Sequence, residues 1–404
     1  MIRRDAPVTD PLEPRGCDGR DAFGSRWKPG VVPMTTVGLT GYGRYFPEET
    51  VSAEEIAAES DVPESVVREK MGLREKRVCP PDGDHATDMC VAAAEGALSD
   101  ADLEPADVDL VVYHGSEYKD HVVWSAAANV AERLGAENAY ATESYTLCAG
   151  APIAVRQTRA QLRADHVDTA LLVAASREED LIDYENDRSS FMFNFGSGAS
   201  AMVLESDPGE RSRAIVHESA AVTDGSFSKD VIMPAGGSLE PPSEETVSTG
   251  LHRLDVPDPD GMKERLAPVS LPNYLEVADT ALERSGLCRG DLDFVAVTHM
   301  KRSFHERLFE ELGLDPVTDG YYLDFVAVTH MKRSFHERLF EELGLDPVTD
   351  GYYLDEYGHV QSADQIIALE EGRREGLLEP GDVVCFLAAG TGYTWSATAL
   401  TWQG

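Results

Sequence analysis

The chain has 404 residues, and 42% of them are hydrophobic, so it is long enough to bury the core of two domains or of one duplicated unit. Its 73 acidic residues against 35 basic ones give a formal net charge of -38, which excludes nucleic acid as a natural partner because that contact needs a basic face. We expect such a chain to work in concentrated salt, as in a halophile, because counterions must screen its self-repulsion; an ordinary acidic enzyme is the alternative.

Membrane and metal signals are missing from the sequence. No apolar run has the length of a membrane span and the N-terminus lacks an apolar signal region, so we expect a cytoplasmic protein that does not contact a membrane. The six cysteines form no CxxC pair and no His/Cys cluster at zinc spacing. We therefore expect free thiols in a reducing compartment, and neither a metal nor a cofactor.

The chain divides by composition into an extension and two α/β halves. Residues 1–33 are rich in Pro, Gly, Arg and Asp without periodicity, which predicts a disordered extension or a mis-called start with Met34 as the true first residue. In the half 34–210 the pattern predicts a strand and turn within 35–49, helices at 51–60, 63–72, 86–103 and 124–136, strands at 108–116, 138–144, 169–176 and 193–206, and a helix that begins at Cys148. In the half 211–404 it predicts helices at 271–286, 303–313 and 362–376 and strands at 293–299 and 383–390. This alternation is typical of an α/β fold with largely buried strands.

One segment of 31 residues occurs twice, letter for letter, at 292–322 and 323–353. Repeats of a solenoid diverge and need several copies to bury a core, so two identical copies indicate a recent tandem duplication or an assembly error. His299 and His330 occupy the same place in the two copies and compete for one structural position.

The segment 144–162, SYTLCAGAPIAVRQTRAQL, places a thiol where a polar stretch meets a helical pattern. Ala149, Gly150 and Ala151 leave room for a substrate, and Pro152 is tolerated only in a first helical turn. A helix N-terminus carries unpaired N–H groups and a partial positive charge, which stabilise a thiolate. Cys148 is therefore a candidate nucleophile; a small buried hydrophobe is the alternative.

A nucleophilic cysteine needs a base or a cation beside it. The strand DFVAVTH ends in His299, or in His330 of the second copy, and His359 lies in the loop DEYGHVQSADQ just before a helix. The turn at Gly390 and Gly392, in AAGTGYTWSATAL, can present backbone N–H groups as an oxyanion hole. A hydrogen-bonded structural role is the alternative for each histidine, and it is the one expected for the others, including His114.

Seven motifs in order resemble one family. They are TGYGRYFPEE, MGLREKR, LCAGAPIAV, FNFGSGASAMVLE, VTHMKRS, YGHVQSAD and GTGYTWSATAL. From about Thr35 to Trp402 the chain resembles the thiolase superfamily, in its type III ketoacyl-ACP synthase branch. The resemblance implies a five-layered αβαβα thiolase fold of two pseudo-symmetric halves, a homodimer, acyl-CoA and acyl-thioester substrates, and acyl carrier protein as a further candidate partner.

The resemblance also implies roles for single residues. Cys148 would carry the acyl group, and the histidine of VTHMKRS would stabilise an enolate oxygen. The backbone N–H groups of Cys148 and Gly392 would form the oxyanion hole, with Gly390 beside the substrate. Lys70 falls where the family often has a basic residue near the CoA phosphates.

Two departures from the family leave alternatives open. His359 stands where the family has an asparagine in YGN; a histidine can still donate to an enolate oxygen, and it can also act as a base. Glu117, in YHGSEYKDH, resembles the general base of the hydroxymethylglutaryl-CoA synthases; a solvated surface acid is the alternative.

The sequence therefore carries three functional hypotheses. The first is a condensing acyltransferase of the 3-oxoacyl-ACP synthase III kind, in which a cysteine acyl-enzyme formed from acyl-CoA makes a carbon–carbon bond. The second is an aldol condensation of acetyl-CoA with acetoacetyl-CoA that uses Glu117. The third is a non-catalytic scaffold with a thiolase fold, which the exact repeat keeps open.

Overall fold

The computed structural model describes residues 35–69, 71, 73–164, 166–297, 307–308, 311–314, 320–322 and 356–404. These residues alternate between strands and helices in chain order, which confirms the predicted α/β class. Within the described ranges no helix combines the length and the apolar character needed to cross a membrane. Residues 1–34, which include the predicted extension, lie outside them.

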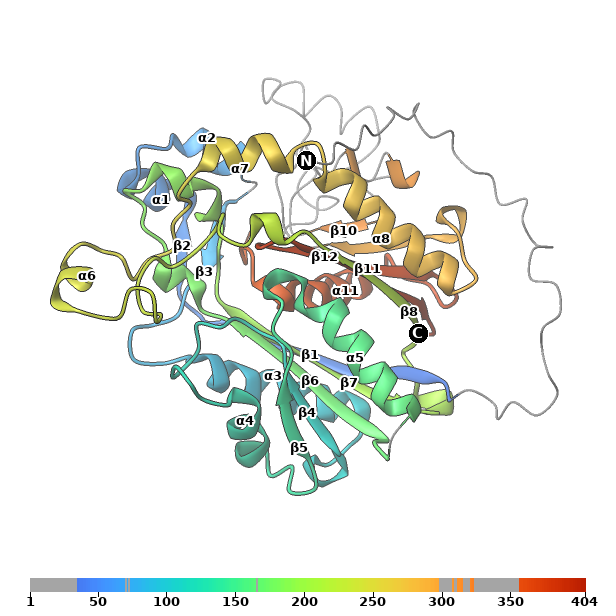
Figure 1. The fold of residues 1–404 in the computed structure, drawn as a ribbon. Coiled ribbons are helices and arrows are strands. Elements are labelled where there is room, and N and C mark those ends of the chain that lie inside the picture. The colour runs from blue at the N-terminus through green and yellow to red at the C-terminus, as the bar shows by residue number, and fades with distance from the viewer. Residues whose placement is uncertain are drawn as a thin grey trace, which may run out of the picture. The chain divides into compact units, whose positions relative to one another are not determined.

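Ten strands form one mixed sheet in the order β10-β9-β11-β12-β8-β1-β7-β6-β4-β5 (Figure 1). The strands are β1 (Val37–Tyr45), β4 (Leu110–Tyr113), β5 (Tyr140–Glu143), β6 (Thr169–Ser176), β7 (Gly198–Ser206), β8 (Ala214–Thr223), β9 (Phe294–Val297), β10 (Gly320–Tyr322), β11 (Val383–Gly390) and β12 (Thr394–Trp402). A separate antiparallel pair joins β2 (Thr50–Ser52) to β3 (Glu75–Arg77).

The sheet consists of two five-stranded halves with the same topology. Read outward from the junction between β1 and β8, each half continues with two antiparallel pairings and then two parallel ones. The first half runs β1-β7-β6-β4-β5 and the second β8-β12-β11-β9-β10. We propose that the division near residue 210 separates these two halves, since it falls between β7 and β8.

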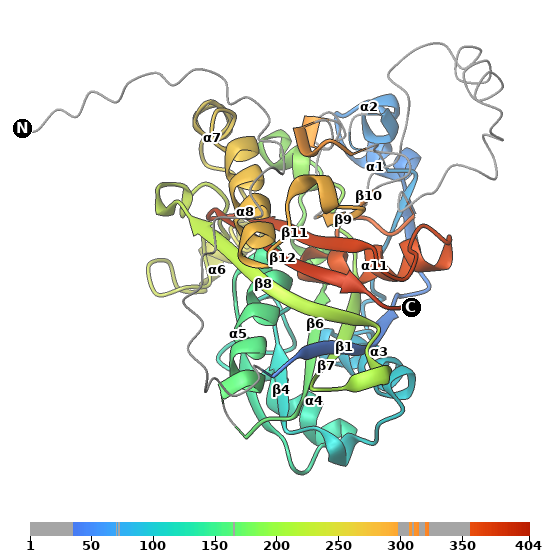
Figure 2. The ribbon, with the colours of Figure 1, turned by 90° about the vertical axis from the view of Figure 1, so that its right-hand side faces the viewer.

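Helices cover the outer faces of both halves and fill the space between them (Figures 1 and 2). The helices are α1 (Ala53–Glu59), α2 (Glu64–Glu69), α3 (Ala86–Ala101), α4 (Ala126–Leu134), α5 (Gly150–Ala164), α6 (Glu244–Ser248), α7 (Pro259–Leu266), α8 (Ser270–Arg284) and α11 (Asp364–Arg374). One apolar cluster joins α3 and α4 to the first half of the sheet, and another joins α8 to the second half. The central cluster joins α5 and α11 to strands of both halves, which gives the layer order αβαβα.

The alternation of side chains along each strand explains the layers. In β4, Leu110 and Val112 belong to the central cluster, whereas Val111 and Tyr113 face α3 and α4. Successive side chains of a strand point to opposite faces, so a strand with helices on both sides is apolar throughout. The eight buried residues of β6, TALLVAAS, show the same double burial.

Two sequence predictions change in detail. The strand predicted at 193–206 begins only at Gly198, because a 3₁₀ turn at Asp187–Met192 and a bridge from Phe195 to His359 occupy the preceding residues. The prediction missed β8, which mixes buried and half-buried residues without regular alternation. Cys288 is disulfide-bonded, so the expectation of free thiols is wrong for this residue, whereas Cys79, Cys90, Cys148 and Cys385 are free and buried.

Candidate active site

Cys148 lies in a 3₁₀ turn, Leu147–Ala149, that runs directly into α5. Its side chain is 5% exposed, and the α5 helix behind it is 15 residues long. The partial positive charge at this helix N-terminus favours the anionic form of the sulfur. Leu147 adopts a φ of 53°, which is rare for a residue with a side chain, and such strained backbone is typical of functional sites.

Two glycines let other parts of the chain approach this turn closely. A Cβ atom on Gly390, at the end of β11, would lie 2.6 Å from the Thr146 carbonyl oxygen and 3.1 Å from the Cys148 nitrogen. A Cβ atom on Gly150 would lie 2.6 Å from the His114 carbonyl oxygen, at the end of β4. Glycine is required at both places because any side chain would push the turn that carries Cys148 away from the sheet.

His359, which lies in the C-terminal half of the chain, contacts the sulfur of Cys148. Its Nε2 lies 3.2 Å from Cys148 Sγ, and its Nδ1 lies 2.6 Å from Oδ2 of Asp364, the first residue of α11. The other carboxylate oxygen of Asp364 accepts the N–H of Val360 at 2.8 Å. The three side chains therefore form a Cys–His–Asp chain in which the carboxylate orients the imidazole and the imidazole faces the sulfur.

The charges of Asp364 and Cys148 affect the protonation of the His359 imidazole. Burial lowers the pKa of His359, but the charges of Asp364 and Cys148 outweigh it and hold that pKa well above its usual range. His359 is 4% exposed and Asp364 fully buried, so water screens these charges little. The arrangement favours a protonated imidazole beside the sulfur.

A buried lysine fixes the loop that carries His359. His359 exchanges backbone hydrogen bonds with Asn194 and Gly196, and its ring meets the Phe195 ring edge-on at 5.2 Å. Lys76, on β3 and fully buried, donates from Nζ to the Phe195 carbonyl oxygen at 2.6 Å. Burial lowers the pKa of Lys76 to about 8, against the opposing charge of Glu179.

The glutamate predicted as a general base does not have the burial expected of one. The Glu117 side chain is exposed, and its role stays a prediction. The buried carboxyl in this region is Glu178, which accepts the Ser116 hydroxyl at 2.5 Å where β4 and β6 end side by side. Burial raises the pKa of Glu178, and the hydrogen bond from Ser116 and the charge of His359 oppose that rise.

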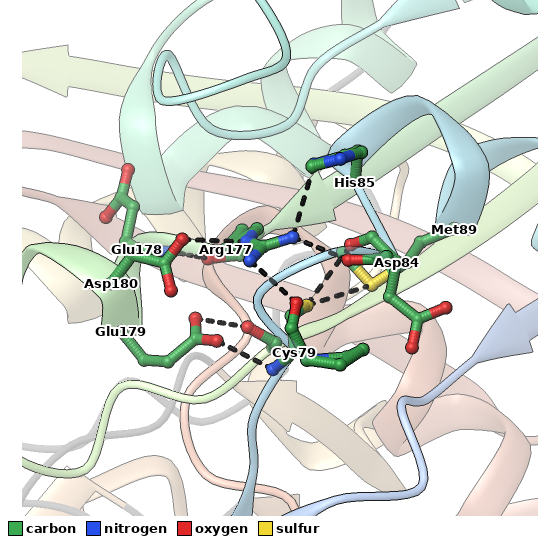
Figure 3. Close-up of polar contacts among 12 residues, drawn as sticks. Cys79, Asp84, His85, Met89, Arg177, Glu178, Glu179 and Asp180 are labelled. Atoms are coloured by element: carbon green, nitrogen blue, oxygen red, sulfur yellow. Dashed lines mark hydrogen bonds and ion pairs between the residues drawn. The ribbon is translucent and has the colours of Figure 1, made fainter.

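Arg177 holds the segment that contains Glu178 (Figure 3). Its guanidinium donates to the carbonyl oxygens of Gly83 at 2.6 Å and Pro80 at 2.9 Å, and to Asp180 at 2.7 Å. Glu179 points the other way and accepts the Cys79 N–H at 2.9 Å. Because these contacts hold the residues on both sides of Glu178 in place, they also restrain the position of its carboxyl group.

The structure describes only some of the remaining predicted site residues. Lys70, His299 and His330 lie outside the described residues. Gly392 lies in the turn between β11 and β12 with a φ of 108°, and a Cβ atom there would meet nothing within 4 Å, so its N–H as an oxyanion donor stays a prediction. His114 is buried beside Ser362, and burial lowers its pKa to about 3, which fits the structural role expected for it.

Two protein-family models match the chain around these residues. The model of 3-oxoacyl-[acyl-carrier-protein (ACP)] synthase III matches residues 143–225, and its C-terminal counterpart matches residues 321–402. The β-ketoacyl-[acyl-carrier-protein] synthase III of Desulfitobacterium hafniense is 28% identical over 371 residues, which cover 92% of this chain and 99% of the relative. The chain is therefore similar to β-ketoacyl-ACP synthase III over nearly its whole length and is a synthase III-like protein.

Further comparisons agree with this assignment. A relative of the same description from Symbiobacterium thermophilum is 26% identical over 371 residues, or 92% of this chain and 99% of the relative. The crystal structure of 3-oxoacyl-[acyl-carrier-protein] synthase III from Aquifex aeolicus superposes with a TM-score of 0.71 at 20% identity, covering 91% of this chain and 100% of that one. The predicted thiolase-like α/β fold is confirmed, and this synthase III-like chain is a condensing acyltransferase.

The two copies of the repeat remain alternatives in this synthase III-like chain. The described strand β9, Phe294–Val297, belongs to the first copy and shortly precedes His299. The C-terminal family model begins at residue 321 and so covers His330 in the second copy. Both histidines therefore stay proposals for the same place in the enzyme.

Sequence reasoning missed Asp364, Gln361 and Glu178. Asp364 opens a helix, where an aspartate is commonly only a cap, and Gln361 has no titratable group to attract attention. Glu178 stands in a run of four charged residues that looks like a solvated loop. The usable signal was the spacing H-x-Q-x-x-D from 359 to 364, which places an acid one turn beyond a candidate catalytic histidine.

Proposed function

We propose that Cys148 takes an acyl group from acyl-CoA and passes it to the carbon of a second acyl thioester. The approach of His359 Nε2 to Cys148 Sγ, at 3.2 Å and at a helix N-terminus, carries this proposal. The thiolate attacks the thioester carbonyl, the carbon–sulfur bond to CoA breaks, and the leaving thiolate takes the proton of the His359 imidazolium. Backbone N–H groups at Cys148 and Gly392 would hold the oxyanion that forms between these events.

The second half of the reaction joins two carbon atoms. A malonyl thioester, on acyl carrier protein or on CoA, loses CO₂, and the electron pair of the broken bond forms an enolate. The enolate carbon attacks the Cys148 thioester, the carbon–sulfur bond breaks, and the thiolate is restored. His359, with His299 or His330, would donate hydrogen bonds to the enolate oxygen while the charge is on it.

The carboxylate behind His359 favours a second candidate, acyl transfer to an oxygen or nitrogen nucleophile. An imidazole paired with Asp364 at 2.6 Å can remove a proton from a hydroxyl group or an amine as that group attacks the acyl-enzyme. The attack forms an ester or an amide, and the Cys148 thiolate leaves. An asparagine at position 359 would have no such base function.

Mass spectrometry of the acylated protein tests the first step. Incubation with acetyl-CoA, with and without molar KCl, is expected to add one acetyl group at Cys148. Adding malonyl-ACP is then expected to remove it as an acetoacetyl thioester, whereas release by a simple alcohol or by water would favour the second candidate. A protein that takes up no acyl group under either salt condition contradicts the proposed function.

Substituting the two glutamates separates decarboxylative condensation from aldol condensation. Decarboxylation supplies its own electron pair, so Glu117→Ala is expected to leave that activity within about twofold, as for an exposed side chain. Glu178→Gln is expected to lower it about tenfold, because the buried carboxyl interacts with His359 and with Ser116. Product formation from acetoacetyl-CoA that disappears in Glu117→Ala alone would instead identify Glu117 as an aldol base.

A further inference from the structure

Gln361 contacts the reacting atom itself. Its Oε1 lies 2.5 Å from Cys148 Sγ, and the residue is 2% exposed. Its Nε2 is buried and has no hydrogen-bond partner among the residues that the structure describes. A buried amide group with one end on the nucleophile and the other end unpaired is costly unless the unpaired end has a use in another state of the site.

The two forms of Cys148 require opposite ends of this amide. A carbonyl oxygen can accept a hydrogen bond from the thiol, but a thiolate has no hydrogen to donate. Oε1 facing a thiolate would place two electron-rich atoms in contact. Exchange of the amide oxygen and nitrogen leaves the shape of the side chain unchanged and directs an N–H group at the sulfur.

We propose that Gln361 is a catalytic residue, whose Oε1 accepts from the Cys148 thiol and whose Nε2 donates to the Cys148 thiolate. The proton leaves Sγ for Nε2 of His359, and the amide of Gln361 turns about its last side-chain bond. No covalent bond of Gln361 forms or breaks. This inference rests on the proposed function only in taking Cys148 as the nucleophile.

The backbone of Gln361 is shaped for this contact. Gln361 adopts a φ of 55°, although it carries a side chain, and it begins a 3₁₀ turn that leads into α11. The next residue, Ser362, donates to the His114 carbonyl oxygen at 2.6 Å and so anchors the turn to the end of β4. Left-handed backbone at a residue other than glycine persists only where its surroundings enforce it, and here it aims the amide at the sulfur.

Other ionisable groups near the sulfur do not replace this contact. His359 is the one titratable side chain with a hydrogen bond to Cys148 among the described residues. Three tyrosines lie close enough for the charge of Cys148 to affect them, and burial together with that charge raises the pKa of Tyr145, Tyr274 and Tyr393 above its usual range. These tyrosines stay neutral at physiological pH, so a pH-dependent change on replacing Gln361 reports the loss of its amide.

The test measures alkylation of Cys148 by iodoacetamide as a function of pH, without any acyl substrate. Gln361→Met keeps the length of the side chain and its neutrality but removes the donor. We expect the pH of half-maximal alkylation to rise by about one unit, so that the rate at pH values below both midpoints falls about tenfold, as for the loss of one hydrogen bond to a charged group. Gln361→Glu adds a negative charge as well and is expected to produce a larger shift.

Gln365→Met is the matched control, because it changes a buried glutamine on α11 whose Nε2 donates to the Leu387 carbonyl oxygen. We expect its alkylation profile to match the unmodified protein. Thermal unfolding identifies the temperature at which each variant is folded, and the alkylation is measured below it. Wild-type profiles in both Gln361 variants would overturn the inference, even if the protein forms an acyl-enzyme as proposed.

Discussion

Replacing Cys148 by alanine is expected to abolish the acyl-enzyme and to lower the rate of condensation by at least on the order of 10³-fold. The sulfur is the strongest nucleophile of the Cys148–His359–Asp364 set, and His359 and the helix N-terminus are placed to act on it. The adduct is measured by mass spectrometry of the intact protein after incubation with acetyl-CoA, and the rate by product release from a malonyl thioester.

A second buried thiol provides the control for this substitution. Cys90 lies on α3, fully buried, and burial raises the pKa of its thiol beyond the physiological range. Cys90→Ala is therefore expected to keep both the adduct and the activity. An acetyl group that persists in Cys148→Ala, or that disappears in Cys90→Ala with the protein still folded, would place the nucleophile elsewhere.

Asp364→Asn is expected to lower the rate of Cys148 acylation at neutral pH by on the order of 10⁴-fold, a loss comparable to that seen when the orienting carboxylate of a serine triad becomes an amide. The negative charge of Asp364 is a main reason why the pKa of His359 stands well above its usual range. Without it burial dominates, the imidazole is neutral at pH 7, and the thiolate loses its ion-pair partner. Single-turnover acylation, followed between pH 5 and pH 9, measures the effect.

The same substitution changes how stability depends on pH. In the unfolded chain an unpaired histidine has a pKa of about 6.5, whereas in the folded protein the pKa of His359 is raised. The His359–Asp364 pair therefore stabilises the fold fully below about pH 6.5, and this contribution is lost as the pH rises through the raised folded-state pKa. Thermal unfolding of Asp364→Asn is expected to lack this fall. A variant that keeps both the acylation rate and the pH dependence would contradict the role of Asp364.

Asp293→Asn is the control for Asp364→Asn. Asp293 accepts the Val383 N–H through Oδ2 at 2.9 Å, where β9 and β11 begin and at the opposite end of β11 from Gly390. Both substitutions remove one negative charge from a chain whose net charge is -38, so a general effect of charge would appear in both. A difference in acylation rate between Asp364→Asn and Asp293→Asn therefore reports the local effect of Asp364 on His359.

Much of the architecture follows from short-range patterns in the sequence. The run TALLVAAS predicts a doubly buried strand over the same residues that form β6. The helix predicted to begin at Cys148 is α5, which begins at Gly150 after a 3₁₀ turn that contains Cys148. Small residues and a proline after a cysteine are enough to predict the start of a buried helix, because backbone geometry limits what those residues can do. Local pattern failed at β8, whose partners β1 and β12 are far away in the sequence.

The chemistry of the site depends on contacts that no local pattern contains. Cys148 and His359 were recognisable from the sequence, because a thiol at a helix start and a histidine in a glycine-containing loop are reactive groups at positions where active sites commonly lie. Other features of the site depend on how the ends of β4, β6 and β11 meet the loop before α11. These features are the contact of Asp364 with the imidazole and of Gln361 with the sulfur. They also include the burial of Glu178, in contrast to the exposed Glu117. Proton affinity and hydrogen-bond direction are set by distances of a few ångströms between such segments, and those distances exist only once the sheet has brought the two halves of the chain together.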